Sequence, residues 1–165
     1  MRLIGCLSDT HGYLNEQLFD FFAGCDEIWH AGDIGNVEVA LRLENFKPLR
    51  AVCGNVDGTE LRGEFPSHLR FELEGTDVWI THIGGYPGKY DRGIKSHIME
   101  HPPRLFICGH SHILKVVNDN KLGLLHINPG AAGRAGIHRV STAVRFALDA
   151  GKVKDLEVIE LEKMF

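Results

Sequence analysis

The feature that most constrains the fold is an alternation of apolar runs rich in Ile, Val and Leu with amphipathic stretches over the first two thirds of the chain. This alternation predicts strand, helix, strand units with buried strands. We expect strands at residues 3–7, 27–30 and 49–53, and helices at residues 14–22 and 37–46. The beginning of the chain is therefore predicted to form a layered α/β structure.

The pattern changes after residue 69, where strands are expected to follow one another with fewer helices. Residues 69–73 and 78–81 flank a turn cluster and predict a hairpin. A helix is expected at residues 89–100 and should end before the two prolines that follow it. Further strands are expected at residues 105–108, 114–117, 124–127, 142–148 and 153–161, the last two as a hairpin. These elements predict mixed sheets in a single domain over residues 1–165.

Five of the apolar runs end in a short polar motif. The motifs are Ser8-Asp9-Thr10-His11, Gly32-Asp33, Gly54-Asn55-Val56-Asp57, Thr81-His82 and Gly109-His110-Ser111-His112. Binding sites in open α/β sheets form outside the carboxyl ends of the strands, so we expect these five ends to converge. Each motif alone is typical of a turn or a capped residue. Together they supply two aspartates, one asparagine and four histidines at strand ends.

This set of side chains predicts a metal site. Imidazoles mixed with carboxylates favour Mn, Fe, Zn or Ni over Mg and Ca, which prefer oxygen ligands. In an extended chain residues i and i+2 point the same way, so Asp9 with His11, and His110 with His112, are each expected to present two ligands to one locus. A glycine before three of the motifs lets the chain turn sharply. Two ions are expected, bridged by either aspartate, because one tetrahedral site takes fewer ligands than these seven: Asp9, His11, Asp33, Asn55, His82, His110 and His112.

Composition excludes several other classes of protein. The chain has 18 basic and 22 acidic side chains and a net charge of −4, which argues against a nucleic-acid duplex as partner. No apolar run approaches membrane-spanning length, so we expect a cytoplasmic protein with no membrane partner, and a homo-oligomer stays open. The four cysteines, Cys6, Cys25, Cys53 and Cys108, are too few and too far apart for a disulfide framework, and the three within apolar runs, Cys6, Cys53 and Cys108, are expected to be buried thiols.

The order of the motifs resembles that of the calcineurin-like metallophosphoesterase superfamily, in particular its small phosphodiesterases of the YfcE type. That pattern runs D-x-H, G-D, G-N-x-D/E, H and G-H-x-H. The chain carries SDTHG from residue 8, HAGD from residue 30, GNVD from residue 54, His82, and GHSH from residue 109. Asn128-Pro129-Gly130 resembles a further loop of the family. The resemblance implies a two-sheet mixed α/β sandwich with flanking helices.

The resemblance also implies a binuclear-metal-dependent phosphodiesterase that acts through a metal-bridging hydroxide. One implied metal site consists of Asp9, His11, Asp33 and His112. The other consists of Asp33, Asn55, His82 and His110, with Asp33 as the bridge. Asp33, Asn55 and His82 are accordingly expected to act in catalysis. The implied cofactors are two divalent ions, with Mn favoured over Ni, Zn or Fe.

A small-molecule phosphodiester is the expected substrate. Two divalent cations, two carboxylates and a hydroxide leave a charge of about +1, which suits a monoanionic diester, and Asp57 nearby favours it further over a dianionic monoester. Many members of the wider family carry a histidine where this chain has Val56. Valine has no proton to give, so leaving-group acidity is expected to matter more. The alternatives are a phosphomonoesterase or phosphoprotein phosphatase, and a protein-interaction scaffold on the same fold.

Other side chains are expected to support the site or to contact substrate. His30 lies within a strand and is expected to be a core or supporting histidine, and Asp57 is expected to orient a ligand if it does not face the substrate. Tyr86 and Lys89 belong to a glycine-rich segment that is either a mobile lid or an ordinary loop.

Arg134 and His138 belong to a second glycine-rich segment, residues 130–139. They are suited to grip a phosphate or to replace the missing acid, with surface charges on a turn as the alternative. The histidines outside every motif are expected to be exposed or to lie at helix ends: His68, His97, His101 and His126.

Overall fold

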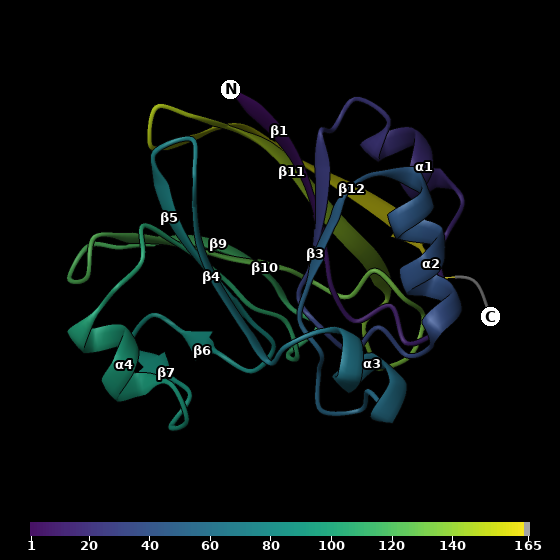
Figure 1. The fold of residues 1–165 in the computed structure, drawn as a ribbon, viewed down its shortest axis with the longest axis horizontal. Coiled ribbons are helices and arrows are strands. Elements are labelled where there is room, and N and C mark those ends of the chain that lie inside the picture. The colour runs from purple at the N-terminus through teal and green to yellow at the C-terminus, as the bar shows by residue number, and fades with distance from the viewer. Residues whose placement is uncertain (164–165) are drawn as a thin grey trace.

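Alternating apolar side chains along the strands build two five-stranded sheets in the computed structural model, which describes residues 1–163. Helices lie outside the sheets, α1 to α3 on one side and α4 on the other (Figure 1). The helices are α1 (Gln17–Phe22), α2 (Val37–Phe46), α3 (Thr59–Glu64) and α4 (Lys95–Glu100). The strands are β1 (Arg2–Leu7), β2 (Glu27–His30), β3 (Leu49–Ala51), β4 (His68–Leu73), β5 (Thr76–Thr81), β6 (Gly85–Tyr86), β7 (Lys89–Tyr90), β8 (Leu105–Ile107), β9 (Leu114–Asp119), β10 (Leu124–Pro129), β11 (Val140–Asp149) and β12 (Lys152–Glu162).

The strand order explains why the polar motifs meet. The first sheet has the order β12-β11-β1-β2-β3, with β1, β2 and β3 parallel. The second has the order β4-β5-β8-β10-β9, with β5, β8 and β10 parallel. Because parallel strands end at the same edge of a sheet, both sheets deliver their motifs to one end of the molecule. The expected two-sheet mixed sandwich with flanking helices is confirmed.

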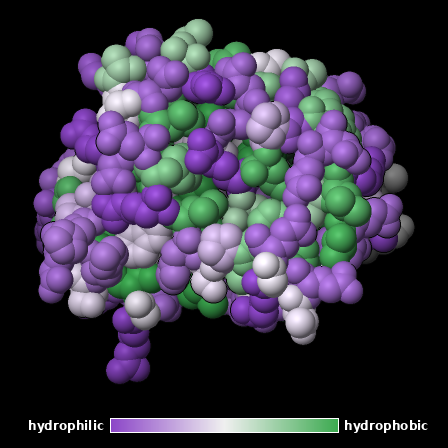
Figure 2. Space-filling model, in the orientation of Figure 1, coloured by the Kyte–Doolittle hydropathy of each residue, from purple (hydrophilic) through white to green (hydrophobic). Residues whose placement is uncertain are grey.

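Three apolar clusters hold the layers together. The cluster between the sheets includes Trp29 and Ile80, and the Trp29 ring packs edge-on against Phe71 with 5.3 Å between ring centres. A second cluster joins the first sheet to α1 and α2, and a third joins the second sheet to α4 through Ile98 and Phe106. The cysteines are free, and Cys25 is buried as well as the three for which burial was expected. In the space-filling view, hydrophobic residues show in the middle of this face and hydrophilic residues along much of its outline (Figure 2).

Most expected elements are confirmed, and the differences concern short ones. Residues 27–30 and 37–46 form β2 and α2 as expected, and the final hairpin is β11 with β12. The helix expected at residues 14–22 begins only at Gln17. The helix expected at residues 89–100 is wrong in its first half, where a tight hairpin of β6 and β7 forms. Helix α3 was not expected, because it buries a single side chain, Leu61, and so lacks an amphipathic pattern.

Among the described residues, no helix is long and apolar enough to cross a membrane.

Candidate metal centre

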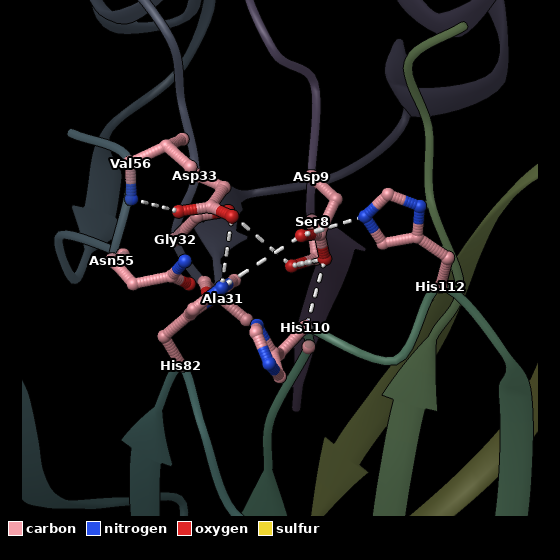
Figure 3. A network of polar contacts seen from close by, with 12 residues as sticks. Ser8, Asp9, Ala31, Gly32, Asp33, Asn55, Val56, His82, His110 and His112 are labelled. Atoms are coloured by element: carbon pink, nitrogen blue, oxygen red, sulfur yellow. Dashed lines mark hydrogen bonds and ion pairs between the residues drawn. The ribbon is translucent and has the colours of Figure 1, made fainter. Parts of the chain in front are cut away.

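The five polar motifs converge at the edge where the parallel strands end, and their side chains form two neighbouring groups (Figure 3). One group is Asp9, His11 and His112, and the other is Asp33, His82 and His110. Within each group the atoms able to bind a metal lie within 4.8 Å of one another. Residues that are about 100 positions apart in the chain therefore face a common locus, as the motif pattern predicted.

Each aspartate reaches histidines of both groups. Asp9 Oδ1 lies 3.3 Å from His112 Nε2 and 3.7 Å from His11 Nε2. The same oxygen lies 3.8 Å from His82 Nε2. Asp33 Oδ2 lies 3.1 Å from His82 Nε2 and 3.7 Å from His11 Nε2. Both carboxylates are thus central, and the histidines surround them.

Asn55 lies beside the second group. Figure 3 shows its side chain next to Asp33 and His82. It also lines a cavity of about 340 Å³ together with His82 and Arg62. The sequence-predicted ligand set is therefore assembled in space, with Asn55 at the exposed side.

The buried atoms of this centre fit a cation. Asp9 Oδ1, His11 Nε2 and His82 Nε2 are buried and have no hydrogen-bond partner among the described residues. Leaving a buried polar atom unpaired costs about 1–3 kcal/mol, so three of them at one locus need a common partner. Imidazole nitrogens with carboxylate oxygens are the donor set of divalent transition-metal ions. The residues present therefore match the requirements of a divalent metal.

Backbone conformation at the centre differs from the extended geometry that we expected. Of the eight described non-glycine residues with positive φ, five are candidate ligands, with φ of 54° at Asp9, 45° at His11, 57° at Asp33, 71° at His110 and 64° at His112. His110 and His112 fall into different groups, the division that the family resemblance implied, because left-handed residues turn the chain between them. Such conformations cost of order 1–3 kcal/mol each and cluster at functional sites.

Two glycines allow the close approach of these segments. A Cβ atom on Gly54 would lie 2.1 Å from Asp33 Oδ1. A Cβ atom on Gly109 would lie 2.1 Å from Ser8 Oγ and 2.7 Å from Asp9 Oδ2. The prediction that glycines keep bulk away from the centre is confirmed at these positions.

In each of the two aspartates, hydrogen bonds engage one carboxylate oxygen and leave the other to face the candidate metal locus. Asp9 Oδ2 accepts from Ser8 Oγ at 2.7 Å and from the His110 backbone N–H at 3.0 Å. Asp33 Oδ1 accepts from the Val56 backbone N–H at 3.0 Å. The remaining oxygens, Oδ1 and Oδ2 respectively, point at the histidines. The orientation of both carboxylates is thus fixed by groups outside the ligand atoms.

The electrostatics of the centre favour positive charge. Burial alone would raise the pKa of Asp9, but the neighbouring imidazoles of His11 and His112 outweigh it and hold this pKa well below its usual range. Burial lowers the pKa of His82, yet Asp33 and Asp9 raise it above the ordinary value. His82 Nδ1 donates to the Ala31 carbonyl at 2.7 Å, which leaves Nε2 facing the carboxylates. The ionised carboxylates therefore stabilise either protonated histidine rings or a bound cation.

His30 is a buried supporting histidine, as predicted. Its Nδ1 accepts from the Gly32 N–H at 3.0 Å, so its Nε2 carries the proton and donates to Thr10 Oγ1 at 3.0 Å. The Thr10 hydroxyl in turn donates to the Ile34 carbonyl at 2.8 Å. Burial lowers the pKa of His30 to about 4, so the ring is neutral and locks the Thr10 and Asp33 loops together.

Asp57 supports the loops and does not face an open substrate site. It is 3% exposed, and its carboxylate accepts backbone N–H bonds from Gly54 at 2.8 Å, Gly35 at 2.9 Å and Ile34 at 3.2 Å. These bonds tie the Asp33 loop to the Asn55 loop. Of the two roles expected for Asp57, the geometry supports orienting a ligand over facing the substrate.

Sequence analysis missed Arg62, which lies on α3. Its Nε donates to the Asp57 carbonyl at 2.7 Å, and its Nη2 donates to the carbonyls of Gly54 at 2.8 Å and Asn55 at 3.4 Å. Because these acceptors are backbone groups, no side-chain motif marks the interaction. A basic residue a few positions after G-N-x-D is the one signal that the sequence offered.

The other residues that were predicted to contact substrate fall into two sets, those beside residues of the metal centre and those away from the cavities. Tyr86 lines a cavity that also contains His110, and the His138 ring lies 5.3 Å from that of His112, with Nε2 bonded to the Gly133 carbonyl at 2.8 Å. Lys89 is exposed on β7 and lines none of the cavities described here.

The Arg134 guanidinium packs 4.4 Å from the centre of the Tyr13 ring. The expectation that His126 is exposed or at a helix end is wrong. It lies in β10, an interior strand of the second sheet, and is 1% exposed.

The fold and the two groups of aspartate and histidine define a metallophosphoesterase. The family model for the calcineurin-like phosphoesterase superfamily domain matches residues 1–151, so the chain belongs to that superfamily. A probable metallophosphoesterase from Methanothermobacter thermautotrophicus is 31% identical over 136 residues, which cover 78% of this chain and 76% of the relative.

Solved structures agree on the fold. A novel archaeal phosphodiesterase superposes with a TM-score of 0.75 at 21% identity, covering 96% of this chain and 99% of that one. A Vps29 mutant from Entamoeba histolytica has a TM-score of 0.74 at 16% identity, covering 97% and 99%. At these identities the similarity establishes the architecture alone.

Proposed function

We propose that the chain acts, as a single domain, as a phosphodiesterase that uses two divalent metal ions, with Mn favoured. The observation that carries this proposal is the set of buried, unpartnered atoms of Asp9, His11 and His82, which face one locus in a phosphoesterase fold. Three such atoms would be a net cost to the fold if nothing bound there. A metal-dependent hydrolase explains why the cost is retained.

The ligand assignment follows the two groups. Asp9, His11, Asp33 and His112 would hold one ion. Asp33, Asn55, His82 and His110 would hold the other. Shared ligation by Asp33 is supported by the distances from Asp33 Oδ2 to histidines of both groups, 3.7 Å to His11 Nε2 and 3.1 Å to His82 Nε2.

When bound, such ions lower the pKa of water to about 7 and stabilise charge on phosphoryl oxygens. The chain's own contribution is to orient the ligands before substrate arrives. The Val56 N–H fixes the Asp33 carboxylate, and the Ala31 carbonyl fixes the His82 ring. Preorganised groups of this kind need no rearrangement during the reaction.

One property of the centre selects the leaving group, and a second favours a diester over a monoester. The Val56 side chain is 54% exposed and offers no proton at the position where many relatives carry a histidine. The centre therefore suits leaving groups that depart without protonation, such as phenolates. A site charge of about +1 also matches a monoanionic diester better than a dianionic monoester.

The test is hydrolysis of bis-p-nitrophenyl phosphate by purified protein with added Mn, set beside p-nitrophenyl phosphate as the monoester with the same leaving group. We expect Mn-stimulated turnover of the diester at a higher kcat/KM, about two metal ions per chain by elemental analysis, and loss of both in Asp33→Ala. Arg42→Ala, an exposed residue paired with Glu16, is the matched control and keeps both. A monoester preference, or unchanged turnover in Asp33→Ala, would overturn the proposal.

A further inference from the structure

A cavity of about 430 Å³ opens beside His110 of the metal centre. It lies on the outer face of the second sheet, between the β6-β7 hairpin and strands β9 and β10. Tyr86 comes from the hairpin, Lys115 from β9, and His126 and Asn128 from β10. Because His110 belongs to its lining, a group held here is next to whatever the metal centre holds.

The floor of the cavity carries an unused hydrogen-bonding group. His126 is 1% exposed, and its buried Nδ1 has no hydrogen-bond partner in the part of the chain that the structure describes. Burial, with the nearby Lys115, lowers the pKa of His126 to about 4, so the ring is neutral at pH 7. A neutral imidazole offers one donor and one acceptor. Its Nδ1 is the ring nitrogen that is left for a complementary group.

Ser111 adds a second unused donor. Its Oγ accepts from Asn128 Nδ2 at 3.0 Å and from the Ile113 N–H at 3.2 Å. Asn128 is itself fully engaged, since Nδ2 also donates to the Gly109 carbonyl at 3.1 Å and Oδ1 accepts from the Gly130 N–H at 3.0 Å. With both acceptor positions of Ser111 Oγ filled, its own proton is available to a ligand.

Two large exposed side chains, Tyr86 and Ile113, line the cavity beside its polar residues. Tyr86 is 43% exposed, and the Lys115 ammonium lies 4.7 Å from the centre of its ring. Ile113, also in the lining, is 62% exposed. Among the lining residues Lys115 is balanced by Asp91, so the cavity carries no excess of positive charge for a second phosphate.

These properties select the kind of group that fits. An alkyl chain would leave the buried His126 Nδ1 unpaired, at a cost of about 1–3 kcal/mol, and would cover the exposed Ser111 hydroxyl without pairing it. A planar heterocycle can lie against Tyr86 and present donors and acceptors at its edge. We propose that this cavity binds one ester group of the diester substrate and selects a nucleobase, stacked on Tyr86 and hydrogen-bonded by His126 and Ser111. The assignment rests on the proposed phosphodiesterase function.

The test compares two Mn-dependent substrates with one leaving group, p-nitrophenyl thymidine 5′-phosphate and p-nitrophenyl methyl phosphate. Stacking and edge contacts are expected to raise kcat/KM for the nucleoside ester about 10-fold or more, chiefly through KM. His126→Phe, which removes the ring nitrogens, and Tyr86→Ala, which is a surface change, should bring the ratio of the two values near one. His101→Phe is the same substitution outside the cavity and should keep the wild-type ratio.

A second measurement separates this inference from the proposed function. Metal-free protein is titrated with thymidine 5′-monophosphate while the ring ¹⁵N signals of His126 are followed by NMR, and the signals are expected to shift. If neither diester is hydrolysed but the signals shift, the cavity assignment is supported and the proposed function fails. If both diesters are hydrolysed at equal kcat/KM and the signals do not shift, the cavity assignment is overturned and the proposed function stands.

Discussion

Gly54 sets how close the Asn55 loop comes to the metal centre. Because an added Cβ would lie 2.1 Å from Asp33 Oδ1, Gly54→Ala must displace the carboxylate. Displacing the partners that orient metal ligands typically costs 10–100-fold, so we expect kcat/KM on bis-p-nitrophenyl phosphate to fall roughly 100-fold and the bound metal to drop below two ions per chain.

The control for this substitution is Gly63→Ala on α3. Within residues 1–163 no outside atom lies within 4 Å of a Cβ added at Gly63. Replacing a helical glycine by alanine should stabilise the protein by about 0.5–1 kcal/mol and leave activity unchanged. Equal activity of the Gly54→Ala and Gly63→Ala variants would contradict the steric argument.

Arg62 is the positioning residue that the structure adds to the ligand set. Its planar guanidinium reaches three backbone carbonyls of the Asn55 loop, which a lysine ammonium cannot match. We expect both Arg62→Ala and Arg62→Lys to raise the Mn concentration for half-maximal activity roughly 10-fold. Urea unfolding should show a loss of only about 1–2 kcal/mol. Full rescue by lysine would show that charge alone matters.

At the scale of elements, prediction from sequence succeeded where local pattern and burial coincide. β2 and α2 were predicted to the residue. β2 is a fully buried strand, and α2 was predicted from the apolar spacing of Val37, Leu41 and Leu43, although the structure buries Val39, Ala40 and Leu43. The ligands were predicted because each lies in a short motif next to a strand end. Helix α3 and the β6-β7 hairpin were not predicted, because contacts distant in sequence stabilise them. These two elements border the cavities beside the metal centre, so the shape of those cavities could not be predicted from the sequence, although Tyr86 was expected as a substrate contact.

The β6-β7 hairpin is anchored by one such distant contact. The Tyr90 hydroxyl donates to Asp119 Oδ2 at 2.6 Å, and both residues are buried. A hydrogen bond to a charged group contributes about 1.5–3 kcal/mol, so Tyr90→Phe should lower the free energy of unfolding in urea by that amount. Tyr13→Phe removes a hydroxyl without a hydrogen-bond partner among the described residues and should change stability by less than about 0.5 kcal/mol. A similar loss in both variants would refute the anchoring role.

For the whole molecule, the distribution of histidines separates the metal centre from the rest of the fold. His11 and His82 face carboxylates, which raise their pKa values against the effect of burial. His30 on the first sheet and His126 on the second are buried without a carboxylate partner, and burial lowers both pKa values to about 4. The two kinds of histidine therefore change stability with pH in opposite directions.

The sign for His126 follows from the unfolded chain, where histidine titrates near pH 6.5. Between pH 6.5 and 4 the unfolded chain binds a proton that the folded protein excludes, so the stability due to neutral His126 is complete above pH 6.5 and is lost as the pH falls toward 4. His126→Phe removes this dependence. From pH 7.5 to 4.5 the variant should gain about 2–3 kcal/mol relative to wild type in urea unfolding of metal-free protein. Because the other titrating groups are common to both proteins, the difference isolates His126.

The control is His101→Phe, at an exposed position, whose stability curve should run parallel to that of wild type. A parallel curve for His126→Phe would mean that the pKa of His126 is the same in the folded and unfolded chains, and would contradict the burial of an unpaired neutral ring.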